Sequence, residues 1–202
     1  MNKHLWQRVF HLVLAISAGM IASVACSTAS STPASVVTST SNLLTRATLQ
    51  IEDFSPGWQM SPPSDEMVDG VPGRIVGFHG SREPDLMWVL VGQEAYSYSS
   101  AESAAEAYPA WVKKYLPMLG QGGWQQVSDW DFPNQATQKI IACLPAKING
   151  NQVTSCRVVA QYQNLIVIVY GNLTKDRWLT VEDFRNLLTA MDRRIVEALK
   201  SP

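Results

Sequence analysis

The chain has 202 residues, of which 46% are hydrophobic and 16% charged, a composition typical of a globular protein and not of a disordered one. Its formal net charge is -1. Removing residues 1–25 takes away two basic residues, Lys3 and Arg8, and none of the 17 acidic ones, so the remaining chain carries -3. With no basic excess to neutralise phosphates, nucleic acid is excluded as a partner.

Residues 1–25 have the pattern of a signal peptide. A short positive start contains Lys3 and Arg8, and the apolar run that follows is too short to stay in a bilayer as a spanning helix. The stretch Ser23-Val24-Ala25-Cys26 resembles the bacterial lipobox, in which a cysteine is acylated, with palmitate among the acyl chains, and becomes the first residue. Ser23 stands where leucine is usual, so plain secretion remains an alternative, as does an uncleaved anchor.

Acylation of Cys26 predicts a lipoprotein anchored to the lipid bilayer on the extracytoplasmic side, either in the periplasm or at the cell surface. Residues 26–42 contain serine, threonine, alanine and valine and no charge, which predicts a flexible linker behind the lipidated cysteine. After plain secretion the same residues would be a loose N-terminus.

The folded part is predicted to be a single domain at residues 43–202. β-branched and aromatic runs indicate strands, turn residues indicate loops, and apolar residues at helical spacing indicate helices. The first expected elements are a loop at 62–73, strands at 74–80 and 86–98, and a helix that is capped by Ser99, kinked at Pro109 and extends to Leu119. A loop at 120–134 with a short strand at 125–128 follows. The last expected elements are strands at 137–144, 153–162 and 165–170 and a helix capped by Thr180. This order predicts an α+β domain, an antiparallel β-sheet of about five strands with two packed α-helices.

Three of these elements have additional signals. Ser99 followed by Glu102 has the spacing of a capping box. Residues 165–170 are apolar throughout, which predicts a central strand covered on both faces. The last helix carries one apolar stripe, made of Phe184, Leu187, Leu188, Met191, Ile195, Ala198 and Leu199.

Asn149-Gly150 is a strong signal for a two-residue hairpin turn, because both positions tolerate positive φ. A hairpin closed there places Cys143 opposite Cys156 on a non-hydrogen-bonded pair, where Cα atoms lie about 4.5 Å apart. That spacing is within disulfide range, and an oxidising compartment favours the bond. Two free buried thiols are the alternative.

A second tight turn at Gln163-Asn164 extends the same register to the next strand. It pairs Val158 with Val169 and Cys156 with Gly171. These pairings predict a row of apolar side chains across three strands.

The sequence contains only weak signals for a group of catalytic residues. His79 is the only histidine left after removal of the leader, and no Gly-x-Ser-x-Gly motif accompanies it. We interpret His79 as a surface or strand-end residue. Asp129 and Asp131 flank Trp130 and could form an acid pair, but two loop acids at this spacing are commonplace. We therefore expect no catalytic residues.

Metal and cofactor binding are not expected either. Zinc sites need several cysteine or histidine ligands, and the disulfide uses two of the cysteines. Asp65, Glu66 and Asp69 lack the spacing of a calcium loop, so a solvated loop is the better interpretation.

Trp58, Trp124 and Trp130 lie in predicted loops rich in glycine and proline. Loop tryptophans can line a ligand groove or a partner surface, and we mark the three as a candidate surface of that kind. Alternatively, they plug the ends of the sheet core.

Several phrases carry a family likeness over about residues 43–199. They are Ile51-x-Asp53-Phe54-x-Pro56-Gly57-Trp58, a Ser-capped alanine-rich helix, a cysteine strand, a strand ending Tyr162-x-Asn164, and a closing helix begun by Thr180-x-x-Asp183. Together they resemble small bacterial lipoproteins and extracytoplasmic sensor-type domains. The resemblance implies an α+β fold and no catalytic residues.

The leading hypothesis is a membrane-tethered, non-enzymatic binding or sensor-type module for an unknown protein or small-molecule ligand outside the cytoplasm. A small hydrolase that uses His79 or an acidic pair is one alternative. An envelope assembly or stability factor is the other.

Overall fold

The structure of the protein, a computed structural model, describes residues 34–80, 90–128, 130, 134–148, 150–175 and 179–200. The described residues all belong to one compact unit, residues 33–202. The expected signal peptide, Cys26, Asp129, Asp131 and Asn149 lie outside the described residues.

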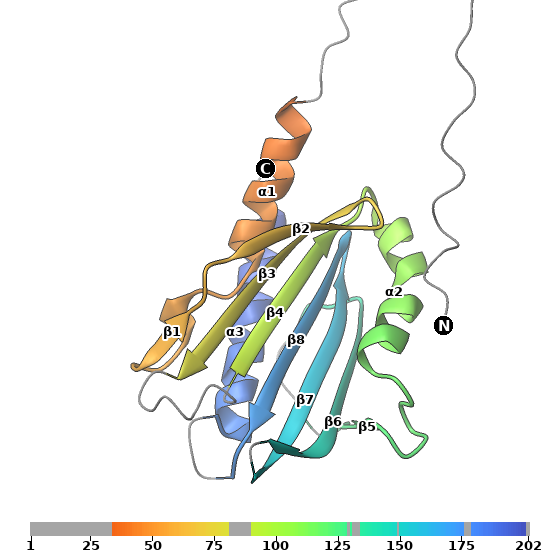
Figure 1. Ribbon diagram of the computed structural model, residues 1–202. Coiled ribbons are helices and arrows are strands. Elements are labelled where there is room, and N and C mark those ends of the chain that lie inside the picture. The colour runs from red at the N-terminus through yellow and green to blue at the C-terminus, as the bar shows by residue number, and fades with distance from the viewer. Residues whose placement is uncertain are drawn as a thin grey trace, which may run out of the picture. The chain divides into compact units, whose positions relative to one another are not determined.

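The centre of this unit is one antiparallel sheet of eight strands (Figure 1). The strands are β1 Trp58–Met60, β2 Ser64–Val68, β3 Val71–Gly80, β4 Leu90–Ser97, β5 Gln125–Gln126, β6 Gln138–Ile148, β7 Asn151–Tyr162 and β8 Leu165–Leu173. They are ordered β1-β3-β4-β8-β7-β6-β5, and β2 also pairs with β3. The apolar strand β8 is central and buried, which confirms the prediction from its sequence.

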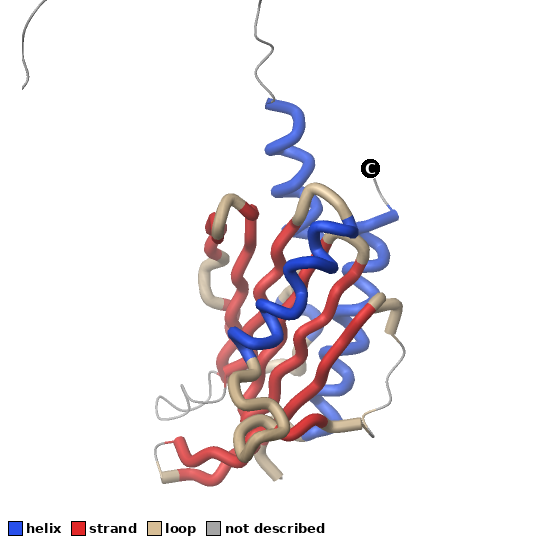
Figure 2. The backbone as a smooth tube through the Cα atoms, turned by 90° about the vertical axis from the view of Figure 1, so that its right-hand side faces the viewer, coloured by secondary structure: helices blue, strands red, loops and turns tan. Residues whose placement is uncertain are grey.

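Helices cover both faces of the sheet, as Figure 2 shows. They are α1 Ala34–Ala47, α2 Ala101–Tyr115 and α3 Val181–Lys200, with a 3-10 turn, η1, at Ile51–Asp53. The α1/α3 face has a core that includes Val76, Phe78 and Val167. On the α2 face, α2 packs against β7 and β8 over a second core around Ile166 and Ile168.

The predicted count of about five strands and two helices is wrong, because the described residues form eight strands and three α-helices. The sheet dominates the unit. Of the three strands beyond that count, β5 is the short strand expected at 125–128, and β1 and β2 are short strands that pair only with β3 at the sheet edge. Edge strands show little apolar alternation, so their sequences look like loops.

Two segments that were expected to be a linker and a loop contain regular secondary structure. Helix α1 begins at Ala34, inside the expected linker at 26–42, and packs against α3 through a buried face that includes Leu44 and Ala47. The expected loop at 62–73 contains β2 and the start of β3, joined by Asp69 and Gly70 with φ of 51° and 81°. Both central residues have positive φ, as a tight hairpin turn requires.

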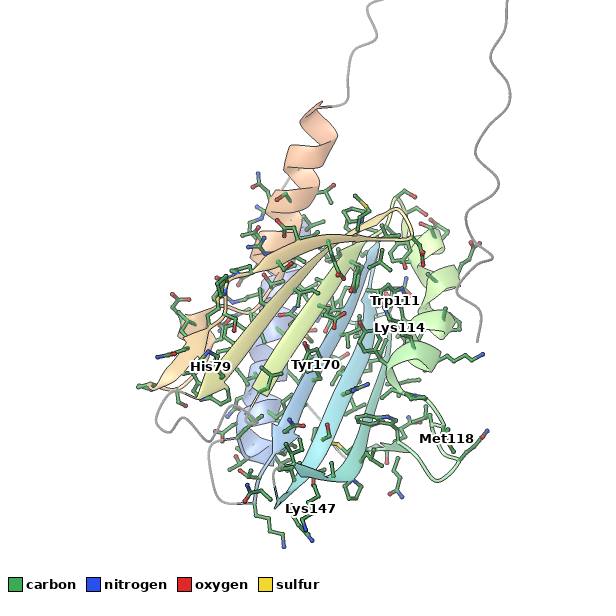
Figure 3. All side chains as sticks on the ribbon, in the orientation of Figure 1. His79, Trp111, Lys114, Met118, Lys147 and Tyr170 are labelled. Atoms are coloured by element: carbon green, nitrogen blue, oxygen red, sulfur yellow. A yellow bond between two sulfur atoms is a disulfide. The ribbon has the colours of Figure 1, made fainter. Side chains whose placement is uncertain are left out.

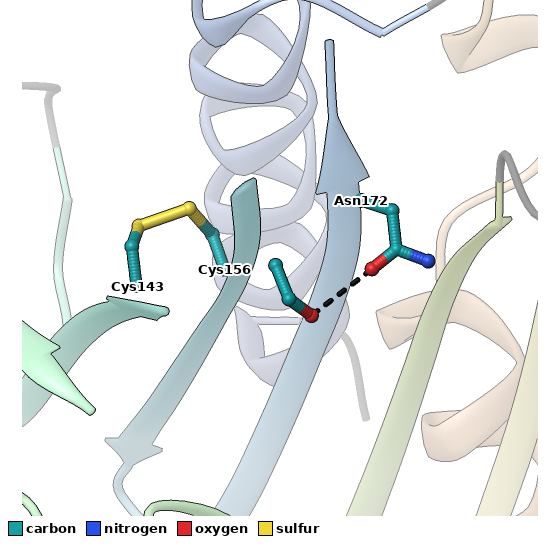
Figure 4. The surroundings of a disulfide bond; sticks show 4 residues. Cys143, Cys156 and Asn172 are labelled. Carbon is teal, nitrogen blue, oxygen red and sulfur yellow. Dashed lines mark hydrogen bonds between the residues drawn. A yellow bond between two sulfur atoms is a disulfide. The ribbon is translucent and has the colours of Figure 1, made fainter. Parts of the chain in front are cut away.

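The predicted registers are confirmed. Ile148 faces Asn151, and Cys143 faces Cys156 with Cα atoms 4.1 Å apart and a disulfide between them (Figure 4). Val158 faces Val169 as expected from the second turn. The disulfide lies on the α1/α3 face, where Cys156 is fully buried.

The helix caps are partly as predicted. Helix α2 is capped by Ser100 and not by Ser99, because Ser100 accepts a 3.2 Å hydrogen bond from the Ser103 N–H, and Ser103 accepts one in return. The helix runs through Pro109 and ends at Tyr115, short of Leu119. Helix α3 has the expected cap, since Thr180 accepts a hydrogen bond from the Asp183 N–H at 3.2 Å.

Candidate functional site

A single cross-strand row on the α2 face carries glycines where the sheet would otherwise present side chains. Gly77 of β3 faces Gly92 of β4, Gly92 faces Tyr170 of β8, and Tyr170 faces Arg157 of β7. We call these four residues the Tyr170 row. Helix α2 packs against β7 and β8 and leaves the β3 and β4 end of this row without a helix above it (Figure 1).

The ring of Tyr170 lies over the backbone of Gly92. A Cβ atom at position 92 would lie 2.1 Å from Cζ of Tyr170, so only glycine leaves room for the ring. At Gly77 the nearest atoms to such a Cβ belong to Ser61, at 3.8 Å and beyond. Figure 3 shows Tyr170 at the middle of the sheet and His79 toward its edge. A Cβ at Gly77 would therefore have only ordinary van der Waals contact with Ser61. Glycine in the interior of a strand often marks a place where a ligand or another backbone approaches closely.

Beside the Tyr170 row lies a group of two acids and two tyrosines, which we call the tyrosine–carboxylate cluster: Glu66, Glu94, Tyr96 and Tyr115. The hydroxyl of Tyr96 is hydrogen-bonded to both Glu66 and Glu94, the latter at 2.8 Å. The hydroxyl of Tyr115 donates to the same Glu94 oxygen. Glu94 is only 9% exposed, so these phenols replace the water that an exposed carboxyl would have.

The environment keeps both phenols protonated. Burial raises the pKa of Tyr96 far above its usual value, and its hydrogen bonds to Glu66 and Glu94 raise the pKa further. Burial and then the hydrogen bond to Glu94 raise the pKa of Tyr115 in the same way. Both hydroxyls therefore remain donors at any physiological pH.

Cations border the site on the side of β7 and α2. The Arg157 guanidinium lies 4.6 Å from the centre of the Trp124 ring and donates to the Tyr115 carbonyl at 2.7 Å. Burial and the charge of Glu94 raise the pKa of Tyr170, whereas the charge of Arg157 lowers it. Tyr170 is thus a half-buried ring that faces Arg157 across the β7–β8 pair and whose pKa also responds to Glu94.

The three predicted tryptophans do not form one surface. Trp124 belongs to the core of the α2 face, and Trp58 and Trp130 pack against the core of the α1/α3 face. Trp130 meets Phe184 edge-on at 6.0 Å, and Trp58 lies 5.0 Å from Phe54. These contacts are those of aromatic plugs at the ends of the core.

Trp58 also borders a surface depression of about 120 Å³ between the η1–β1 segment and α3. Its polar lining is already engaged. Asp53 accepts a 2.5 Å hydrogen bond from Arg194, and Asp183 accepts one from the Thr180 N–H at 2.9 Å. The depression offers an aromatic wall but few polar groups without partners.

The residues that the sequence analysis considered for catalysis or metal binding lie apart from one another. His79 is on β3, opposite Gln59 and Leu90. Asp65 and Glu66, expected in a solvated loop, are on β2, where Asp65 pairs with Arg74 at 2.6 Å. Within the described ranges, no group of three metal-ligating side chains occurs.

Sequence reasoning missed the tyrosine–carboxylate cluster and the Tyr170 row. Glu94 gave a signal, since it is a charged residue inside an apolar strand. The glycines at 77 and 92 gave another, because glycine in the interior of a strand often marks a close approach. Neither signal shows which residues are neighbours.

The fold matches that of a solved structure, "Crystal structure of the extracellular domain of PknH from Mycobacterium tuberculosis", with a TM-score of 0.52. The two chains are 12% identical, and the match covers 78% of this chain and 95% of the other. At that identity the likeness shows the fold alone.

No protein-family model matches the sequence. The search of curated proteins finds no match. None of the helices in the described part of the chain is both long enough and apolar enough to cross a membrane.

Proposed function

We propose that this chain is a non-enzymatic binding or sensor-type module that works outside the cytoplasm, tethered to the membrane through acylated Cys26. Its ligand site is the Tyr170 row on the α2 face. The ligand class is a small organic molecule with a flat apolar surface and polar groups of either charge, because the row combines glycine backbone and an aromatic ring with a guanidinium and a nearby carboxyl.

The observation that carries this proposal is the row itself, in which the half-buried Tyr170 ring lies over Gly92, faces Arg157 on one side and continues through Gly92 to Gly77 on the other. Burying a carboxyl costs free energy even when it is hydrogen-bonded, and apolar side chains would stabilise the sheet at lower cost. Polar groups that perturb one another on an otherwise apolar face are typical of binding sites. Here the charges of Glu94 and Arg157 both act on the half-buried ring of Tyr170.

Three observations support the compartment. The leader has the pattern of an export signal, the disulfide between Cys143 and Cys156 fits an oxidising environment, and the fold matches that of an extracellular domain. Mass analysis of the mature N-terminus tests the anchor directly. An acylated Cys26 is expected, and an unmodified residue at a neighbouring position would leave a secreted protein instead.

No observation favours the hydrolase alternative. In the described part of the chain His79 has no carboxylate hydrogen-bonded to its ring, and the strand neighbours opposite it are a glutamine and a leucine. A triad base needs an orienting acid and a nucleophile within hydrogen-bond reach.

The ligand site can be tested by screening a library of small polar aromatic and sugar compounds against the mature protein by NMR. Shift changes are expected at Tyr170 and its strand neighbours. Gly77→Val adds a side chain to the row, where a Cβ would have only ordinary van der Waals contact with Ser61, and should weaken binding by about tenfold or more. Lys147→Ala, on the distant β6–β7 hairpin, is the matched control. Hits that map to the Trp58 depression, or that bind Gly77→Val unchanged, would contradict the site.

A further inference from the structure

Arg157 is the cation of the Tyr170 row, and two contacts hold its guanidinium in place. The guanidinium lies 4.6 Å from the centre of the Trp124 ring, and Nη1 donates a 2.7 Å hydrogen bond to the Tyr115 carbonyl. Trp124 is itself buried in the core of the α2 face. Stacking on a fixed aromatic ring and a bond to a helix end restrict this long side chain before any ligand arrives.

These contacts use little of the hydrogen-bonding capacity of Arg157. A guanidinium carries N–H groups on each of its nitrogen atoms, and the bond to Tyr115 occupies only Nη1. Among the described residues, Nε of Arg74 is the only buried side-chain nitrogen or oxygen without a partner, so Nε and Nη2 of Arg157 are open to solvent. The half-buried side chain therefore presents N–H donors at the surface of the row.

Within the described ranges no carboxylate forms an ion pair with Arg157. Glu94, the acid beside the row, is buried and accepts a 2.8 Å hydrogen bond from the Tyr96 hydroxyl. Lys114 adds a second cation at the same end of α2, and it lies over the Trp111 ring, 4.5 Å from its centre, instead of meeting an acid. This border of the row therefore carries positive charge that the surrounding side chains do not pair.

Part of this charge has a structural explanation. Cations stabilise the C-terminal end of a helix, and α2 ends at Tyr115 with Lys113 and Lys114 in its last turn. Arg157 contributes to the same helix end through the Tyr115 carbonyl. That role needs one N–H group and a positive charge, which a lysine would also supply. It does not account for a guanidinium that is stacked on Trp124 and whose other N–H groups are open to solvent.

Arg157 and Tyr170 are neighbours across the β7–β8 pair. Counting from the turn after β7, their pair is of the non-hydrogen-bonded kind, in which the Cβ atoms lie about 5 Å apart. Strands β4 and β5 are on opposite sides of this pair (Figure 1). The Tyr170 ring leans toward β4, over Gly92, whereas the guanidinium lies toward β5, beside Trp124. A molecule of the size of one substituted ring can contact both groups.

We propose that Arg157 is the oxyanion-binding residue of the Tyr170 row, which selects a small molecule with an apolar ring and a carboxylate or phosphate group. The planar fork of N–H groups matches the paired oxygens of either group, and its stacking on tryptophan holds the fork in one orientation. This inference rests on the proposed ligand site and narrows its ligand class to anions. Tyr170 contacts the ring of the ligand, and Arg157 contacts its oxygens.

Three matched probes test the charge preference: benzoate, phenyl phosphate and benzamide, each titrated into the mature protein and followed by NMR. All three have the same ring, and benzamide lacks the negative charge. At least one anion should bind at the Tyr170 row about tenfold or more tightly than benzamide, because a charge-assisted hydrogen bond is stronger than a neutral one. The Nε–H signal of Arg157 should shift with that anion and not with benzamide.

Two substitutions separate Arg157 from the general charge of the helix end. Arg157→Gln removes the fork and its charge and should reduce the ratio of anion to benzamide affinity to less than about twofold. Lys113→Gln removes one charge from an exposed position of the last turn of α2 and should leave that ratio unchanged. If Arg157→Gln fails to fold, Arg157→Lys, which keeps the charge but not the fork, should still lower the ratio.

The possible failures are distinguishable. Equal binding of the anions and benzamide at the row would overturn the inference and leave the proposed ligand site standing. A preference that Lys113→Gln reduces as much as Arg157→Gln does would also overturn it, because the field of the helix end would then be the cause. If none of the three probes shifts a signal of the row, the inference fails, and the library screen decides separately whether the row binds other compounds.

Discussion

The side chain of Gln93 is hydrogen-bonded to the backbone of Leu49, from which it accepts a 2.7 Å bond. Its amide nitrogen donates to the carbonyl of Ala47 at 3.2 Å. All three residues are fully buried. Gln93 therefore satisfies two backbone groups at the end of α1 and attaches that helix to β4.

Replacing Gln93 with alanine should lower the free energy of unfolding by about 2–4 kcal/mol, because two buried backbone groups lose their partners. Chemical denaturation measures the loss. Gln152→Ala, at an exposed position of β7, is the control and should change stability by less than about 0.5 kcal/mol. Equal effects of the two substitutions would show that α1 does not depend on this attachment.

The two glycines of the Tyr170 row should respond differently to alanine. At Gly92 a Cβ would collide with the Tyr170 ring, so Gly92→Ala should destabilise the protein by about 1–3 kcal/mol. At Gly77 there is room, and Gly77→Ala should change stability by less than about 1 kcal/mol. Thermal or urea unfolding of both variants makes the comparison.

A double substitution shows whether the collision is the cause. In a Tyr170→Ala background the ring is absent, so Gly92→Ala should lose most of its additional cost. If the cost of Gly92→Ala is the same with and without the ring, the close approach of Tyr170 to β4 is not what requires glycine there.

Alkaline pH should destabilise the fold through buried phenols. Burial raises the pKa of Tyr108 to about 12, and burial also raises the pKa of Tyr96 and Tyr162 above the ordinary value of 10.0. The folded state then holds protons that the unfolded state loses above about pH 10, so stability is present below that pH and falls above it. For Tyr108 the loss is at most about 1.4 kcal/mol for each pH unit up to about pH 12.

Urea unfolding followed between about pH 9 and about pH 11.5 measures this slope. Tyr108→Phe should reduce the slope by one proton. The phenolate absorbance of the folded protein should also rise for fewer tyrosines than that of the unfolded protein. A slope that Tyr108→Phe leaves unchanged would contradict the buried, neutral state of Tyr108.

The elements that sequence reasoning identified correctly are those in which local and long-range signals agree. The Asn149-Gly150 turn and the Gln163-Asn164 turn set the register of three strands, and apolar alternation placed the same residues on one face. The Asp69-Gly70 turn carries the same kind of signal, yet it joins β3 to a polar edge strand. Without an apolar face, the residues of β2 resemble a loop.

Helix α1 and the candidate site were missed for a different reason. The sequence of α1 is rich in serine and threonine, and its order depends on tertiary contacts, such as those of Gln93 and the bond from Arg46 to the Ala198 carbonyl. In the cluster, Tyr96 and Glu66 are 30 residues apart in sequence. Only the strand order makes them neighbours.

The disulfide should contribute less to stability than a disulfide that closes an otherwise open loop of the same size. Cys143 and Cys156 are separated by 13 residues and lie on two strands that their own turn and ladder already hold together. Closing a loop of this size removes about 3 kcal/mol of unfolded-state entropy when nothing else closes it. Because the β6–β7 hairpin restricts the same loop, Cys143→Ala with Cys156→Ala should destabilise the protein by only about 1–2 kcal/mol.

Two measurements check this. Thiol titration of the denatured, non-reduced mature protein should find neither Cys143 nor Cys156 reactive, and finding two reactive thiols would exclude the bond. Denaturation of the double variant and of the unmodified protein, both with intact tertiary structure, then gives the difference. A loss well above about 3 kcal/mol would mean that the hairpin does not persist in the unfolded chain.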